Sequence, residues 1–209
     1  RLMFAFIAEQ SGIVPWTSAI SLMGALSRGP EDTAVGTVAN WLGQFAYGHG
    51  LPAFIWLSNM YGECSLREIL WANSAALRAA ERNICMPTGC CTSPEERYSG
   101  NELSLYWQAA SAIMFSSSGA AFSPAGGHTG LETRFNGEVF NAVAGMEREK
   151  ANRLIEAIYA RFEAHRNEPS EPKHFPDLYD VKTIQPKPEH LAAYQRVKED
   201  LARLGVPFK

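Results

Sequence analysis

Short apolar runs alternate along the chain with longer segments in which apolar residues recur at helical spacing. The runs Leu2–Ala8 and Pro52–Leu57 are apolar throughout, a pattern typical of strands buried on both faces. A connection containing Gly, Pro and Ser follows the first run. A helix is then predicted from Pro30 to near Gly48, from four apolar residues at helical spacing: Val35, Val38, Leu42 and Phe45.

The same succession of strand and helix continues after the second run. Ser65-Leu-Arg-Glu68 has the pattern of a capping box and precedes the apolar positions Ile69, Ala72, Ala76 and Ala79. Ile84–Pro87 predicts a short third strand, and Leu103–Phe115 predicts the helix after it. Ala120–Ser123 predicts a fourth strand. The pattern from Leu131 to His165 is helical, with an interruption near Gly145.

About four strand-then-helix units, each with a strand that is apolar throughout, indicate a parallel sheet covered by helices, so the predicted fold class is α/β. We assign residues 1–167 to this domain. From Glu168 the chain becomes a polar linker that contains proline. Pro188 then opens a last helix that ends at Gly205, and residues 168–209 are predicted to form a linker and a helix docked on the domain.

Composition narrows the class of protein. Of 209 residues, 46% are hydrophobic and 20% charged, as in an ordinary globular protein. The 19 Lys and Arg against 22 Asp and Glu leave no basic excess for nucleic acid. The first apolar run is too short for a bilayer and lacks a signal-peptide pattern, so no membrane association is predicted. Four cysteines are too few for a disulfide scaffold, which favours a cytoplasmic location.

Polar residues that follow the predicted strands are the candidates for chemistry, because active sites of parallel α/β folds lie at the carboxyl ends of the strands. Glu9 follows the first strand, where partial desolvation would suit a carboxylate to general acid or base work; a solvated carboxylate is the alternative. Asn59 and Tyr61 follow the second strand. Asn59 is predicted as a hydrogen-bond donor in a pocket.

The segment Cys85–Cys91 contains three thiols, which at this density can bind zinc. Its spacing is not a clean Cys-x-x-Cys pair and no second pair follows, so buried structural cysteines are favoured and no metal is predicted. His128 follows two glycines at a helix start, where it could meet a polar ligand or have no role. Phosphate-loop, dinucleotide, hydrolase-elbow and zinc-protease motifs are absent from the sequence.

Several stretches, in the same order along most of the chain, resemble the monomethylamine:corrinoid methyltransferase family. The C-terminal part contains Leu178-Tyr-Asp-Val-Lys-Thr-Ile-Gln-Pro186 and ends in Leu-Gly-Val-Pro-Phe208. The likeness also covers Gly29–Thr33, Cys85–Cys91, His128–Arg134 and Gly137-Glu-Val139. The series across five stretches carries the resemblance, because no single motif is diagnostic.

The resemblance implies a (β/α)8 TIM barrel that moves a methyl group from a methylamine to the cobalt of a corrinoid carried by a separate protein. Such barrels need about 250 residues, so about four units correspond to the carboxyl half of a barrel with a C-terminal helical tail. The family's pyrrolysine, thought to hold the amine, would lie upstream of Arg1, and no cofactor is expected to be covalently bound in this chain. An open half exposes sheet edges, so we expect a homo-oligomer.

The resemblance also assigns site residues. The family's acidic residue after the first strand falls near Ser18, and its Gln and Tyr at the third strand fall near Asn83 and Cys85. Either the register is shifted and Glu9 is the acid, or the chain is a divergent member with another methylated substrate. The predicted catalytic set is Glu9, Ser18, Asn83 and Cys85, and the predicted pocket residues are Asn59, Tyr61 and His128.

Two further hypotheses stay open at this point. One is a barrel enzyme with a Cys-rich metal site, such as a methyltransferase with a different methyl donor, which bound zinc would distinguish from the first. The other is a half-barrel module or fragment without activity, which should associate or fold poorly alone because its sheet edges are unpaired.

Overall fold

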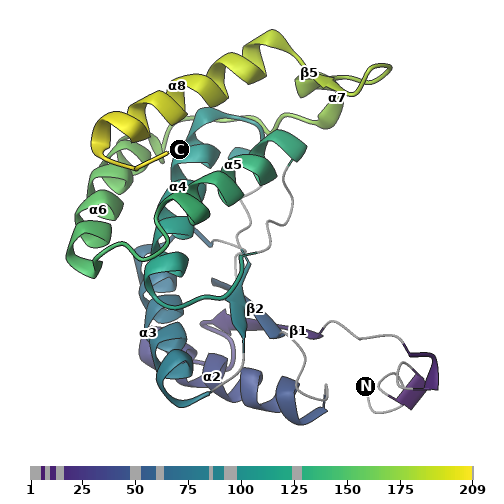
Figure 1. Cartoon of the computed structure of the whole chain (residues 1–209), viewed down its shortest axis with the longest axis vertical. Helices are drawn as coiled ribbons and strands as arrows, with labels where there is room; N and C mark the ends of the chain where they lie inside the picture. Colours follow the sequence, from purple (N-terminus) through teal and green to yellow (C-terminus); the bar gives the residue numbers. More distant parts are fainter. Residues whose placement is uncertain are drawn as a thin grey trace. The chain divides into compact units, whose positions relative to one another are not determined.

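A computed structural model describes residues 6–7, 10–12, 17–47, 53–59, 64–84, 87–91, 98–123 and 129–208 (Figure 1). The chain forms two compact units. Unit 1 consists of Arg1–Cys91 and Ser118–Pro124, and unit 2 consists of Thr92–Ser117 and Ala125–Lys209. The division of the chain between residues 167 and 168 stays a prediction.

Unit 1 contains a parallel sheet in which strand order follows chain order, β1-β2-β3. The strands are β1 (Thr17–Met23), β2 (Ala53–Asn59) and β3 (Thr88–Cys90). Helix α2 (Pro30–Tyr47) connects β1 to β2, and helix α3 (Arg67–Asn83) connects β2 to β3. Both helices contact the strands and each other. The predicted α/β class with a parallel sheet is therefore confirmed.

The two faces of this sheet differ in burial. Ser21 lies opposite Leu57 in the register and accepts a 3.0 Å hydrogen bond from Asn40 of α2. Because side chains alternate along a strand, odd-numbered residues of β1 and β2 share this helix-covered face. The other face, here called the second face, includes Ser18, Ile20, Leu22, Phe54, Trp56 and Ser58.

Helix α2 is confirmed, but its buried face is not the predicted one. Val35 is 72% exposed and Leu42 53% exposed, whereas Trp41 is fully buried with Thr33 and Thr37 beside it. The two threonines can be buried because each hydroxyl donates to a carbonyl one turn back, Thr33 to Gly29 at 2.7 Å and Thr37 to Thr33 at 2.8 Å. Apolar periodicity alone misses such a face.

The first strand of the sheet also lies elsewhere than predicted. β1 forms in the segment predicted as a connection, because pairing along its length with β2 outweighs the serines that interrupt its apolar pattern. Of the predicted strand Leu2–Ala8, only Phe6 and Ile7 lie among the described residues, and both are helical.

The third strand begins later than predicted. Ile84 caps the end of α3 and donates its backbone N–H to Ala80, so strand β3 starts only at Thr88. The predicted fourth strand is present as a single parallel bridge between Phe122 and Gly89. The predicted capping box at Ser65 is wrong, because α3 begins at Arg67 and its N-cap residue, Leu66, has no side chain that can accept a capping hydrogen bond.

Unit 2 is mainly helical. Its helices are α4 (Glu102–Ser117), α5 (Gly130–Ala142), α6 (Arg148–His165), α7 (Phe175–Leu178) and α8 (Pro188–Leu204), and β4 (Tyr179–Asp180) pairs antiparallel with β5 (Gln185–Pro186). Helix α4 is buried along most of its length and contacts α5, α6 and α8. The predicted interruption at Gly145 and helix end at Gly205 are confirmed, both with positive φ.

No helix in the described parts of the chain is both long and apolar enough to cross a bilayer.

Gly89 is predicted to be essential for the approach of Phe122 to β3. A Cβ at this position would lie 2.7 Å from both the carbonyl oxygen and a ring carbon of Phe122. Gly89→Ala should therefore lower the free energy of unfolding by about 1–3 kcal/mol. Gly43→Ala, inside α2, is the control, because a Cβ added there would meet no neighbouring side chain or other segment within 4 Å and alanine favours helix. Urea unfolding that shows equal effects for both variants would contradict the prediction.

Candidate functional site

The carboxyl edge of the unit 1 sheet is the candidate site, because ligands of parallel α/β folds bind where the strands end. β1 ends at Met23, which lies beside Asn59 at the end of β2. β3 ends at Cys90, beside Ile55 in the register. Asn59 and Ser58 are both buried at this edge. Asn59 is thus the predicted pocket residue that the structure places at the end of a strand.

Thiols near this edge are protonated at neutral pH or buried. Cys64, Cys90 and Cys91 are free and buried. Burial, and then the charge of Cys91, raise the pKa of the Cys90 thiol well above its usual value. A protonated buried thiol is a poor nucleophile and a poor metal ligand. Within the described ranges, no three His, Cys, Asp or Glu residues gather as a metal site; Cys85 and His128 lie outside those ranges.

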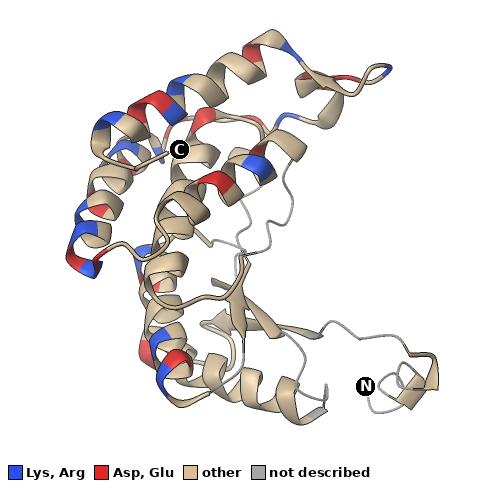
Figure 2. Cartoon of the chain, in the orientation of Figure 1, with Lys and Arg blue, Asp and Glu red and all other residues tan. Residues whose placement is uncertain are grey.

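The strands of unit 1 present neutral groups. β1, β2 and β3 contain no charged residue, and their ribbons carry no charge colour in Figure 2. The second face combines aromatic Phe54 and Trp56 with the hydroxyl of Ser58. Such a lining can hold a small ligand by shape, by hydrogen bonds and by contact of a cation with an aromatic ring.

Two predicted catalytic residues lie away from the carboxyl edge. Ser18 is exposed and lies five residues before the end of β1, about 16 Å along the strand. Asn83 is the exposed last residue of α3, where its Nδ2 donates to the Ala79 carbonyl at 2.8 Å. Because α3 runs back to the start of β3, Asn83 lies toward the amino edge. The structure does not bring Ser18 or Asn83 together with Asn59.

Four predicted site residues lie outside the described residues: Glu9, Tyr61, Cys85 and His128. Their roles, like those of the other predicted site residues, stay predictions.

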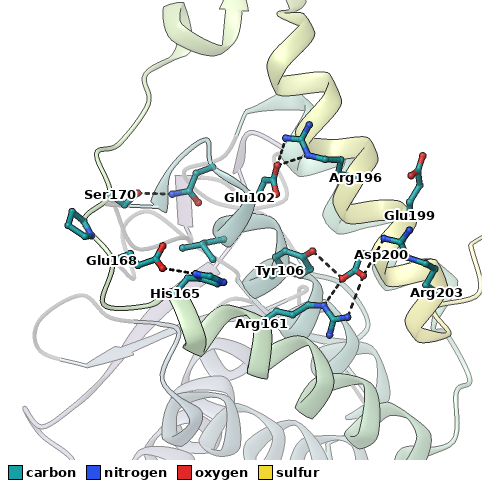
Figure 3. A pocket seen from close by; sticks show the side chains of 13 residues that line it. Glu102, Tyr106, Arg161, His165, Glu168, Ser170, Arg196, Glu199, Asp200 and Arg203 are labelled. Carbon is teal, nitrogen blue, oxygen red and sulfur yellow. Dashed lines mark hydrogen bonds and ion pairs between the residues drawn. The ribbon is translucent and has the colours of Figure 1, made fainter.

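Unit 2 contains a charged cleft of about 810 Å³ between α4, α6, α8 and the segment after α6 (Figure 3). Asp200 accepts a hydrogen bond from Tyr106 at 3.1 Å and forms a 2.6 Å ion pair with Arg161. Burial, and then Asp200, raise the pKa of Tyr106 to about 12. Glu102 pairs with Arg196 across the cleft. Cations and carboxylates thus neutralise one another here, which joins the three helices.

A buried polar network at the start of α5 escaped the sequence analysis. Glu132 is only 2% exposed, and it forms a capping box with Thr129. One carboxylate oxygen accepts from the Thr129 N–H at 2.8 Å and the other from the Ser104 hydroxyl at 2.9 Å. The spacing Thr129-x-x-Glu132 was the available signal. Residues 129–134, the described part of a segment that carries the family resemblance, therefore form the start of a helix.

A second carboxylate joins α5 to α8. Glu138 accepts hydrogen bonds from Tyr194 and Lys198, both at 2.6 Å, and from Arg134 at 2.7 Å. Burial alone would raise the pKa of Glu138, but these three donors outweigh it and lower the pKa to about 2. Glu138 is therefore ionised throughout the neutral range.

The family model for monomethylamine methyltransferase MtmB matches residues 12–206. The chain belongs to this family. Monomethylamine methyltransferase MtmB of Methanosarcina mazei is 38% identical over 80 residues, and MtmB1 of Methanosarcina acetivorans is 35% identical over 80 residues. Each of these alignments covers 38% of this chain and 18% of the relative.

Solved structures share the fold over nearly the whole chain. The crystal structure of the Methanosarcina barkeri monomethylamine methyltransferase is similar with a TM-score of 0.90 at 22% identity. The structure of the hydroxylamine MtmB complex gives the same values. Both cover 99% of this chain and 47% of the other, so the chain spans about half the length of these solved relatives.

Replacement of Glu132 should show the cost of disturbing the network at α5. In Glu132→Gln, one of the two carboxylate oxygens that now accept hydrogen bonds becomes an amide NH2, which cannot accept one. We expect the free energy of unfolding to fall by about 1–3 kcal/mol. Glu149→Gln is the matched control, because Glu149 is exposed and has only a 3.9 Å ion pair with Arg153; it should change stability by less than about 0.5 kcal/mol. Denaturant unfolding that does not distinguish the two variants would be inconsistent with this role.

Glu138 makes stability depend on pH. Its folded pKa lies near 2 and its ordinary value is 4.5, so its contribution is complete above pH 4.5 and is lost as the pH falls toward 2. Glu138→Gln should cost about 1–2 kcal/mol at pH 7. The difference between wild type and variant should shrink below pH 4.5, as measured by thermal unfolding across pH. A difference that stays constant down to pH 2 would show that ionisation of Glu138 is not its cause.

Proposed function

We propose that the polypeptide containing these residues transfers a methyl group from monomethylamine to the cobalt of a corrinoid carried by a separate protein. The observation that carries this proposal is the family match, which spans residues 12–206 and not one isolated motif. The names of the curated relatives, all monomethylamine methyltransferases, supply the substrate class.

In this proposal the chain supplies the carboxyl half of a (β/α)8 barrel. Two observations support it. The strands are parallel and follow chain order, as barrel strands do, and the fold corresponds to about half of a solved relative. Residues 168–209, with α8, would then be the helical tail that the resemblance implies after the barrel half.

The chain's own part in the chemistry would be to orient the amine and keep water away. A Co(I) corrinoid, when its partner protein presents it, supplies the nucleophile that accepts the methyl group. Phe54 and Trp56 on the second face offer aromatic surface to a methylammonium group. The protein's contribution is then mainly positioning and electrostatics.

Among the predicted residues, Asn59 is the last residue of β2 and lies at the carboxyl edge, which supports a role in the site. We propose it as a hydrogen-bonding group for the amine adduct. Glu9 is proposed as the proton acceptor, because β1, β2 and β3 contain no carboxylate. Tyr61, Cys85 and His128 are proposed only as residues around that pocket, whereas Ser18 and Asn83, which lie away from the carboxyl edge, are given no part in it.

The test is methyl transfer by the polypeptide of native length. With a reduced corrinoid protein and monomethylamine, the Co(I) absorbance should disappear and the methyl-Co(III) spectrum should form; trimethylamine should give little change. Asn59→Ala should lower kcat/KM at least about tenfold. Asn152→Ala, an exposed asparagine on α6, is the control and should leave the rate within about twofold.

Circular dichroism of both variants separates a catalytic defect from unfolding, because Asn59 is buried. A native-length polypeptide that leaves the cobalt unmethylated with monomethylamine would refute the proposed function.

A further inference from the structure

Helix α4 carries a polar stripe inside unit 2. Ser104, Gln108 and Ser111 recur at intervals of four and three residues, so they lie on one side of the helix, with Trp107 at the border of that side. Gln108 and Ser111 are 0% exposed, and Ser104 and Trp107 are also buried. Polar groups in such a place destabilise the fold unless they are hydrogen-bonded.

The first turn of this stripe is hydrogen-bonded to α5. The Ser104 hydroxyl donates to Glu132 at 2.9 Å and accepts from Gln108 Nε2 at 3.2 Å. Glu132 also accepts from the backbone N–H of Thr129 at 2.8 Å. A chain of hydrogen bonds therefore runs from the start of α5 through Glu132 and Ser104 to the amide nitrogen of Gln108.

The chain of hydrogen bonds stops at Gln108. Among the residues that the structure describes, no hydrogen-bond partner is found for Gln108 Oε1, Ser111 Oγ or Trp107 Nε1, which are all buried. Ser111 follows Trp107 by four residues and Gln108 by three, so it is a neighbour of both on the helix surface. Helical side chains lean toward the N-terminus, which brings the Ser111 hydroxyl toward the other two side chains.

The hydrogen-bonding types of these three atoms determine which ligand fits. Trp107 Nε1 can only donate and Gln108 Oε1 can only accept, whereas the Ser111 hydroxyl can do either. A cation would be repelled by the indole N–H, and both oxygens of Glu132 already accept hydrogen bonds. An anion would be repelled by Gln108 Oε1. The ligand that fits is neutral, both donates and accepts, and is small enough for a fully buried site.

We propose that one water molecule binds between Trp107, Gln108 and Ser111. The water accepts from the Trp107 indole N–H, donates to Gln108 Oε1 and shares a third hydrogen bond with the Ser111 hydroxyl; about three partners are typical of a buried water. It extends the hydrogen-bonded chain from α5 by one turn along α4. This site lies in unit 2 and is independent of the proposed methyl transfer.

The direct test is a high-resolution crystal structure of the polypeptide of native length. Density for a water should lie about 2.7–3.2 Å from Trp107 Nε1, Gln108 Oε1 and Ser111 Oγ. In the Ser111→Ala variant this density should be lost, because two partners hold a buried water less well than three. Side chains that hydrogen-bond directly to one another, or a site filled by carbon atoms, would overturn the proposal. Density that is unchanged in Ser111→Ala would also contradict it.

Thermal unfolding of the same polypeptide gives a second readout, in which the sign of the change decides. If the Ser111 hydroxyl binds water, Ser111→Ala should lower the Tm by at least about 2 °C, because the water and its other two partners lose a hydrogen bond. If the hydroxyl is buried without a partner, Ser111→Ala should raise the Tm, because an unsatisfied polar group is removed and alanine favours helix. An unchanged or higher Tm would therefore refute the water site.

Ser117→Ala is the matched control for this measurement. Ser117 is the last residue of the same helix, and its hydroxyl donates to the Met114 carbonyl at 3.2 Å. Its replacement should change the Tm by less than about 1 °C. A fall in Tm that is equal in Ser111→Ala and Ser117→Ala would show a general effect of alanine in α4 and would count against the water site.

Discussion

Parallel pairing between β1 and β2 is the constraint on which unit 1 depends. All seven residues of β1 have a partner in β2, and the register fixes which side chains meet α2 and which lie on the second face. A shift by one residue would expose Ile55 and Leu57, both now buried, and would separate Ser21 from Asn40. The burial of α2 and the placement of Asn59 both follow from this register.

The two units differ in how their buried polar and charged groups are paired. The strands of unit 1 carry no charged residue, and burial raises the pKa of the Cys90 thiol. Its buried threonines, Thr33 and Thr37, hydrogen-bond to carbonyls one helical turn away. Unit 2 concentrates its carboxylates between helices, where Glu132, Glu138 and Asp200 each bind two or more donors. The neutral strands of unit 1 suit chemistry that relies on positioning a substrate. The carboxylates of unit 2 hold its helices together.

Sequence patterns predicted the helix boundaries that are marked by proline or glycine. Pro30, Pro188, Gly145 and Gly205 bound helices where expected, because proline and glycine act through local backbone geometry. β1 was missed because its serines hide a strand that exists only through pairing. The buried face of α2 was missed because threonine hydroxyls satisfied within the helix can be buried in place of aliphatic residues. Strand-end reasoning predicted Asn59 at the end of a strand, where β2 ends, whereas Ser18 and Asn83, which came from the family resemblance, lie near the start of β1 and at the end of α3.

The segment Ser118–Pro124 belongs to unit 1 but comes after α4 in the chain. Phe122 reaches its place beside Gly89 only once all of α4 has been synthesised. Unit 1 therefore cannot be completed as it leaves the ribosome in order, and its last contacts form after the first helix of unit 2 exists. The last contact of unit 1 therefore depends on synthesis of α4, which belongs to unit 2.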